Sequence, residues 1–382
     1  MDRTSKATRS ALLTLAGTLL AMLASPAVSQ ERPTTLKQAF ESAFLVGAAL
    51  NPEQFYERNP AEVALITSQF SAITPENNLK WERVHPQPDS FDFSAADRYV
   101  EFGEKHGMFI VGHTLVWHSQ VPAWVFQDGA GQPLSREALL ERMRQHIHTV
   151  VGRYRGRIKG WDVVNEALNE DGTLRQSRWL QIIGEDYLVK AFEFAREADP
   201  NAELYYNDYS LENAPKRAGA VALIRKLQQA GAKVTAIGTQ SHVRMEWPTV
   251  AQADSTIQAF ADLGIKVAVT ELDVDVLPRR EGRGGELTAA ARDSLDPYRA
   301  GLPDRMQQAL ARRYADLFGV YLKHQDVITR VTFWGVTDQQ SWLNGFPTRG
   351  RTNHPLLFDR AGRPKPALAA VLATTRTRGN RP

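Results

Sequence analysis

The stretch "IKGWDVVNEALNEDG" (residues 158–172) begins as an apolar, strand-like segment and then reaches two polar residues, Asn165 and Glu166. Far along the chain, "IKVAVTELDV" (residues 265–274) delivers Glu271 in the same manner. Apolar runs without clean alternation are typical of parallel strands that are buried on both faces. Two such strands, each with a glutamate at its carboxyl end, predict a parallel sheet with a functional site along that edge.

The same kind of segment recurs along most of the chain. Helix-like stretches at 138–154, 187–200, 214–231 and 255–264 separate several of these segments, and the last two end near glycine. The predicted strands are 44–50, 72–77, 109–117, 160–166, 204–208, 236–242, 267–274 and 329–336. Eight strands that alternate with helices predict an α/β protein, a single (β/α)8 TIM barrel whose active site lies at the C-terminal ends of the strands. A doubly wound open sheet is the alternative, but "GAALNPEQF" after the first strand lacks its usual glycine-rich turn.

Composition narrows the class of protein further. With 43% hydrophobic and 23% charged residues, the chain resembles an ordinary globular protein, and no linker divides residues 30–382. The formal net charge of +3 is not concentrated in a basic stripe, which argues against a nucleic-acid partner. The absence of cysteine excludes disulfides, thiolate metal ligands and a cysteine nucleophile.

The N-terminus has the features of a secretory signal peptide. A cationic start precedes the apolar run "ALLTLAGTLLAMLA" (11–24), and small residues follow it. The run is too short to span a bilayer comfortably. Residues 1–29 are therefore predicted to be removed, which leaves a secreted or periplasmic protein without membrane attachment; a monomer is the default expectation.

Polar residues cluster at the predicted carboxyl ends of the strands, where a barrel gathers its catalytic groups. Two glutamates across a barrel mouth suit acid–base chemistry and carboxylate attack, and glycoside hydrolysis needs such a pair. Indole faces pack against sugar rings, and four tryptophans are predicted at or near the rim. They are Trp81, Trp117, Trp334 and Trp342. Trp161 and Trp179 fit the core better.

A metal-dependent hydrolase is disfavoured by the sequence. His113 and His242 come from the third and sixth strands, nearly opposite each other in a barrel, and no HExxH motif is present. A serine hydrolase lacks its G-x-S-x-G elbow. No metal and no cofactor are predicted.

Eight motifs together resemble a family-10 glycoside hydrolase, an endo-β-1,4-xylanase, over residues 35–375. They are "TPENNLKWE", "GHTLVWHSQVPAW", "WDVVNEA", "YYNDY", "GTQSH", "TELDV", "FWGVTDQQSW" and "PLLFDRAGRPKPA". The resemblance implies that xylan and xylo-oligosaccharides are the substrates. It also implies a retaining, double-displacement reaction with Glu166 as general acid/base and Glu271 as nucleophile.

The resemblance assigns further roles to matching positions. Asn165 is expected to bond the sugar 2-hydroxyl, and His242 is expected to hold Glu271 with Asp273 behind it. The residues implied for the non-reducing-side subsites are Glu76, Asn77, Lys80, His113, Trp117 and Gln120. Gln240, Trp334 and Trp342 are expected to frame the cleavage point, and Tyr209 to meet the sugar on the leaving side. The segment 279–301 varies within the family.

Two other functions stay open at this point. A β-1,4-glucanase or a mixed xylan/glucan hydrolase would use the same carboxylates, and a slot near Gln120 and Trp342 would decide between xylose and the larger glucose. A non-catalytic carbohydrate-binding barrel is a more remote alternative, because both glutamates are present.

Overall fold

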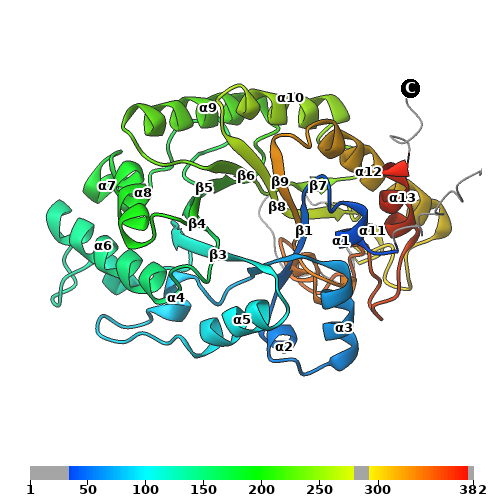
Figure 1. The fold of residues 1–382 in the computed structure, drawn as a ribbon, viewed down its shortest axis with the longest axis horizontal. Helices are drawn as coiled ribbons and strands as arrows, with labels where there is room; N and C mark the ends of the chain where they lie inside the picture. The colour runs from blue at the N-terminus through cyan, green and yellow to red at the C-terminus, as the bar shows by residue number, and fades with distance from the viewer. Residues whose placement is uncertain (1–33, 279–291, 377–382) are drawn as a thin grey trace, which may run out of the picture. The chain divides into compact units, whose positions relative to one another are not determined.

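Eight parallel strands close into a barrel in the computed structural model, which describes residues 34–278 and 292–376 (Figure 1). The ring closes because β1 pairs with both β2 and β9, while β6 pairs with β8. The barrel strands are β1 (Leu45–Leu50), β2 (Ala72–Pro75), β3 (Phe109–Val116), β4 (Gly160–Asn165), β5 (Glu203–Asp208), β6 (Ala236–Thr239), β8 (Lys266–Asp275) and β9 (Ile328–Phe333). The predicted (β/α)8 barrel is confirmed.

The predicted sixth strand, 236–242, is divided in the structure. β6 ends at Thr239, and a short separate strand, β7 (His242–Arg244), pairs with the end of β8 instead. The break follows from Ser241, whose φ of 57° takes the chain out of the extended conformation. Gln240 and His242, which flank Ser241 on either side, both lie at the barrel mouth.

Helices cover the outside of the barrel and connect its strands (Figure 1). The longer ones are α3 (Pro60–Gln69), α5 (Ser94–Lys105), α6 (Arg136–Arg153), α8 (Tyr187–Ala198), α9 (Ala214–Gln229), α10 (Val250–Ala261), α12 (Asp304–Lys323) and α13 (Pro366–Thr374). The short ones are α1 (Leu36–Ala39), α2 (Pro52–Phe55), α4 (Trp81–Val84), α7 (Arg178–Ile183) and α11 (Arg292–Leu295). The helix expected at 255–264 begins earlier, because Thr249 and Gln252 form a capping box.

The end of the barrel where the strands begin is filled by side chains. Arg330 of β9 is 1% exposed and lies over the rings of Tyr205 and Phe109, at 5.1 and 5.8 Å from their centroids. The apolar faces of the strands and helices form one large core around the barrel. This packing leaves the opposite end, where the strands finish, for the active site, as in other packed barrels.

The predicted signal peptide, residues 1–29, lies outside the described residues, as does part of the variable segment after β8. Within 34–278 and 292–376, no helix combines the length and the apolar character needed to cross a membrane.

Candidate active site

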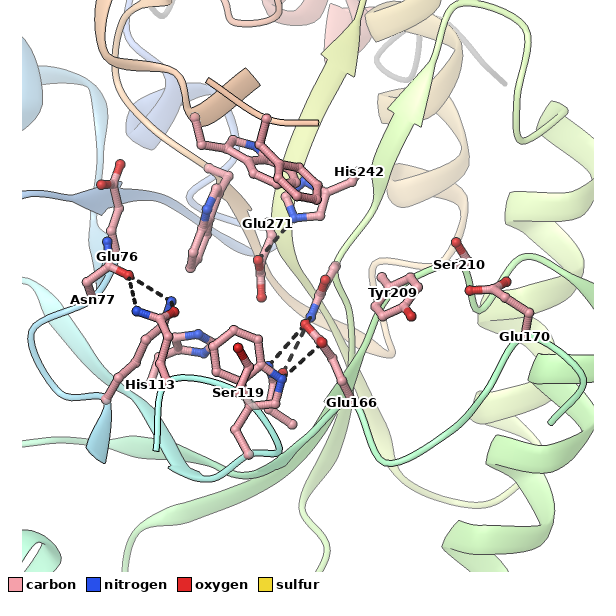
Figure 2. Close-up of a pocket in the computed structure, with 18 of the residues that line it drawn as sticks. Glu76, Asn77, His113, Ser119, Glu166, Glu170, Tyr209, Ser210, His242 and Glu271 are labelled. Carbon is pink, nitrogen blue, oxygen red and sulfur yellow. Dashed lines mark hydrogen bonds and ion pairs between the residues drawn. The ribbon is translucent and has the colours of Figure 1, made fainter. Parts of the chain in front are cut away.

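A cleft of about 1020 Å³ lies at the carboxyl ends of the strands (Figure 2). The structure brings together in its lining all fourteen residues that the sequence analysis proposed as catalytic or substrate-binding. They are Glu76, Asn77, Lys80, His113, Trp117, Gln120, Asn165, Glu166, Tyr209, Gln240, His242, Glu271, Trp334 and Trp342. Asp273 does not line the cleft and lies behind His242, as proposed.

Glu166 directly follows β4 and has a φ of 56°, an unusual conformation for a residue with a side chain. Two backbone bonds hold this turn, because its N–H donates to the Asn207 carbonyl (2.8 Å) and its own carbonyl accepts from Arg175 Nε (3.1 Å). Its carboxyl group accepts hydrogen bonds from Trp117 Nε1 and Gln240 Nε2, both at 3.0 Å. These donors are uncharged, and among residues 34–278 and 292–376 the Glu166 carboxyl group forms no ion pair.

Glu271 lies within β8, is 5% exposed and has a charged partner. His242 Nε2 lies 3.1 Å from Oε2, and Asn207 Nδ2 donates to Oε1 at 2.9 Å. Burial alone would raise the pKa of Glu271, but the hydrogen bond and positive charge of His242, with His113 and Asn207, bring the pKa below its ordinary value. The structure therefore favours an ionised Glu271.

His242 is held between two carboxylates. Its Nδ1 lies 3.0 Å from Asp273 Oδ2, and the same oxygen accepts a 2.7 Å hydrogen bond from Trp342 Nε1. Burial opposes a charge on the imidazole, but Asp273 and then Glu271 outweigh it and raise the pKa of His242 to about 10. His242 is thus a cation at neutral pH and can donate through both ring nitrogens.

A chain of amide groups connects the two glutamates. Asn207 Nδ2 donates to Glu271 Oε1 and, at 3.0 Å, to Asn165 Oδ1, while Asn165 Nδ2 donates to Glu166 Oε1 at 3.2 Å. Thr270 Oγ1 donates to Asn207 Oδ1 at 2.7 Å. Asn207 lies within the motif "YYNDY", and the sequence predicts no role for it, because only the tertiary structure shows that it contacts Glu271.

Charged and amide side chains form one end of the cleft, where Figure 2 shows Glu76 and Asn77. Lys80 Nζ donates to Asn77 Oδ1 and Gln120 Oε1, both at 2.9 Å, and lies 4.9 Å from the Trp117 ring centroid. Burial raises the pKa of Glu76 to about 7, against the opposing effect of Lys80. Burial also lowers the pKa of Lys80, although the surrounding glutamates, led by Glu271, counteract it.

Three of the four tryptophans expected at the rim do line the cleft, and Trp81 does not. Trp81 is 2% exposed and stacks on the buried His146, with ring centroids 3.5 Å apart. Its position at the start of α4 turns the indole away from the cleft and into the core. Trp161 and Trp179 are buried, as predicted. In the described ranges, no group of three or more His, Asp or Glu side chains is placed to hold a metal ion.

The structure adds cleft residues that the sequence analysis missed. They are Ser119, Glu170, Ser210, Asn213, Arg244, Trp247 and Phe346. All lie in loops or short segments beyond the ends of the barrel strands. In such segments the sequence has no periodic pattern from which the direction of a side chain could be predicted. For Ser119, Glu170 and Ser210 the only signal in the sequence is a position a few residues after a strand, and Phe346 lacks even that.

Comparisons with known proteins agree with this geometry. The family described as Glycosyl hydrolase family 10 matches residues 35–374. "Endo-1,4-beta-xylanase A" of Xylanibacter ruminicola is 44% identical over 356 residues, which cover 92% of this chain and 96% of that protein. Among solved structures, an endoxylanase from a sugarcane soil metagenome is 46% identical, with a TM-score of 0.86 and coverage of 90% of this chain and 100% of that one.

A further similar structure was solved with a bound ligand. It is a mutant in complex with xylotriose, with 35% identity, a TM-score of 0.81, and coverage of 89% of this chain and 99% of that one. The extent of these matches, together with the paired glutamates at the barrel mouth, establishes that the chain belongs to glycosyl hydrolase family 10.

Proposed function

We propose that this protein is an endo-β-1,4-xylanase that hydrolyses internal linkages of xylan with retention of anomeric configuration. The observation that carries the proposal is the unequal environment of two carboxyl groups in one cleft. The Glu271 carboxyl group is paired with a cationic imidazole, whereas the donors that the described residues present to the Glu166 carboxyl group are all uncharged. Such a difference separates a nucleophile from a proton donor.

In the first step, Glu271 attacks the anomeric carbon and a covalent glycosyl-enzyme forms. The bond to the glycosidic oxygen breaks, and Glu166 gives that oxygen its proton. His242 keeps the attacking carboxylate charged until the bond forms, and Asn207 orients it through Oε1. The leaving sugar departs as an alcohol.

In the second step, Glu166 acts as a base. It removes a proton from water, the oxygen of which attacks the anomeric carbon and releases Glu271. Two inversions give net retention, and Glu166 ends protonated, as it began. The bonds from Trp117 and Gln240 hold this carboxyl group in place through both steps.

The cleft continues on both sides of the glutamates, which supports an endo-acting enzyme. Glu76 and Asn77 lie on one side, and Tyr209, Ser210 and Glu170 on the other, with Glu166 and Glu271 between them (Figure 2). A polymer can therefore pass through the cleft rather than end in it. The xylanases among the relatives supply the sugar identity.

We also infer that the protein is exported and acts as a monomer. The sequence of residues 1–29 supports the export step. N-terminal sequencing of protein recovered from the periplasm or medium would give a start near residue 30, whereas an intact Met1 in an exported protein would contradict signal removal. A molar mass of two or more chains, measured by light scattering of the purified protein, would contradict a monomer.

The function is tested by product analysis with xylan and with soluble cellulose. Rapid release of short xylo-oligosaccharides from xylan, with little release from cellulose, is expected. Proton NMR of the first product should show the β-anomer before mutarotation. Comparable rates on both polymers would indicate a mixed xylan/glucan hydrolase instead of a xylanase. An α-anomer as the first product would contradict retention. Inactivity on both polymers would favour a non-catalytic carbohydrate-binding barrel.

A further inference from the structure

Lys216, in the first turn of α9, is 0% exposed and does not line the cleft. Its ammonium lies 3.4 Å from the centroid of the Tyr209 ring, which does line the cleft. The same nitrogen lies 3.0 Å from Asp208 Oδ1 and 3.5 Å from Glu170 Oε1. A lysine is buried in this way only when its charge is matched, and here an aromatic face and two carboxylates match it.

The hydroxyl end of Tyr209 is held by a second cation. Arg175 Nη2 donates to the Tyr209 oxygen at 2.9 Å. A phenol oxygen that accepts a hydrogen bond still has its own hydrogen to donate. In the described part of the chain no side chain or carbonyl accepts that hydrogen.

Arg175 also contacts the backbone of the proposed acid/base. Its Nε donates to the Glu166 carbonyl at 3.1 Å, and Nη2 donates to the Leu168 carbonyl at 3.2 Å. One guanidinium thus fixes both the turn that aims Glu166 and the hydroxyl of Tyr209. The two groups therefore keep one relative position.

The loop after β4 is fastened to α9 by close packing as well. A Cβ on Gly219 would lie 2.3 Å from the Gly172 carbonyl oxygen, so the backbones of the loop and helix are in direct contact. Asn213 Nδ2 donates to Glu170 Oε2 at 3.0 Å across the same junction. These contacts join the loop after β4 to the first turns of α9, the helix that carries Lys216.

We propose that Lys216 and Arg175 are positioning residues that clamp Tyr209 so that its hydroxyl donates to the sugar on the leaving side and aligns the glycosidic oxygen with Glu166. Lys216 fixes the ring plane, and Arg175 fixes the oxygen and leaves its hydrogen for the sugar. The clamp deepens the proposed xylanase function and rests on it. It acts only when a sugar, rather than a small leaving group, occupies that side of the cleft.

The test compares two substrates that differ in the leaving group. Xylopentaose places xylose units on the leaving side. In β-xylobiosyl fluoride the leaving group is a single fluoride ion, which does not reach Tyr209. For Lys216→Met, kcat/KM with xylopentaose should fall by about 5- to 20-fold, while kcat/KM with the fluoride should stay within about twofold. Lys226→Met is the matched control, because Lys226 lies on the same helix with a 54% exposed side chain.

Each outcome decides between the clamp and a purely structural lysine. Equal losses on both substrates, or no loss on either, would overturn the clamp. Because Lys216→Met leaves Asp208 buried without its cation, the pair Asp208→Asn with Lys216→Met is measured as well. This double variant should keep the loss confined to xylopentaose, and a double variant with normal activity on both substrates would also overturn the clamp. A wild-type protein inactive on both substrates would instead contradict the proposed function.

Discussion

At the scale of single residues, the two glutamates differ because of the groups around them. Glu271 has a cation and an amide at its oxygens, and Glu166 has an indole and amides. Charge-assisted hydrogen bonds favour the ionised form of a carboxyl group, and neutral donors do so less. The chemistry proposed for each glutamate is therefore set by neighbours that come from other strands.

Glu166→Ala should remove the proton donor but leave the nucleophile in place. We expect kcat on xylan to fall by about 10²- to 10⁴-fold, with a smaller loss on aryl xylobiosides whose leaving groups need little protonation. Azide should restore turnover of the aryl substrate and give a β-xylobiosyl azide, which NMR can identify. An α-azide, or no rescue of a folded variant, would count against the assignment.

Asp273→Asn removes the charge that contributes most to the raised pKa of His242. The pKa of His242 should fall from about 10 toward or below its ordinary value of 6.5, because burial then meets less opposition. Nitrogen-15 NMR of the imidazole measures this pKa directly. Asp254→Asn is the control, since Asp254 pairs with the remote His324 and its loss should not move the His242 titration.

The raised pKa of His242 also makes stability depend on pH. The stabilisation by its two carboxylates is fully present below about pH 6.5 and is lost as the pH rises through about 10. In Asp273→Asn this alkaline loss should begin at a lower pH. Unchanged unfolding curves and an unchanged imidazole titration would show that Asp273 does not control the charge on His242.

Glu76→Gln should stabilise the fold at alkaline pH. Because the pKa of Glu76 is raised to about 7 from 4.5, the folded state loses relative stability as the pH rises through about 7. The variant should therefore exceed the wild type by about 1–2 kcal/mol in unfolding free energy at pH 8, with little difference at pH 4.5. Urea unfolding at both values checks this, and a difference that does not change with pH would contradict it. Glu101→Gln, at a 55% exposed position, is the control.

At the scale of elements, neighbouring strands must approach closely enough for their end residues to meet. Gly238 in β6 makes this possible, because a Cβ there would lie 2.3 Å from Asn207 Oδ1 and 2.8 Å from Thr270 Cγ2. A glycine between β5 and β8 thus gives Asn207 room to bond Glu271. Similarly, the break between β6 and β7 turns Gln240 toward Glu166 and His242 toward Glu271.

Gly238→Ala should displace Asn207 and weaken the link between the two carboxyl groups. We expect kcat/KM to fall by about tenfold or more and the unfolding free energy to fall by about 1–3 kcal/mol. Gly319→Ala in α12 is the control, because no atom lies within 4 Å of its Cβ position and the helix should be slightly stabilised. Full activity in Gly238→Ala would show that the amide link is not required.

At the scale of the whole barrel, the last segments of the described chain close the structure against its first ones. Gln54, after β1, donates to Gln340, after β9, at 2.7 Å. The buried Lys365 donates to Asp338 Oδ2 at 2.9 Å and to the His354 carbonyl at 2.8 Å. This ion pair ties the start of α13 to the segment that leads into Trp342, so closure of the barrel and placement of the rim are coupled.

Lys365→Met should destabilise the protein by about 3–5 kcal/mol, because it leaves the buried Asp338 without its cation. The double variant with Asp338→Asn should recover part of this loss. Denaturant unfolding of the single and double variants measures both effects. Lys323→Met, which breaks a pair with a 62% exposed lysine, should cost at most about 1 kcal/mol; an equal cost for Lys365→Met would refute the coupling.

The barrel and the placement of both glutamates at its carboxyl end could be predicted from the sequence. Local patterns suffice for this, because buried parallel strands are read from apolar runs of residues adjacent in the chain. The resemblance carried by eight motifs extended the prediction to fourteen residues, and all of them line the cleft. The position of a residue along a predicted strand tells whether it lies at the carboxyl end of that strand. The active site of a (β/α)8 barrel lies at the carboxyl ends of its strands.

The contacts between side chains of different strands could not be predicted from the sequence and are known from the folded structure alone. It turned Trp81 into the core, broke the sixth predicted strand at Ser241 and gave Asn207 its place between Asn165 and Glu271. It also buried Lys216 beneath Tyr209. The physical reason is that hydrogen bonds, desolvation and charge pairing depend on distances between residues far apart in sequence, which no local pattern records.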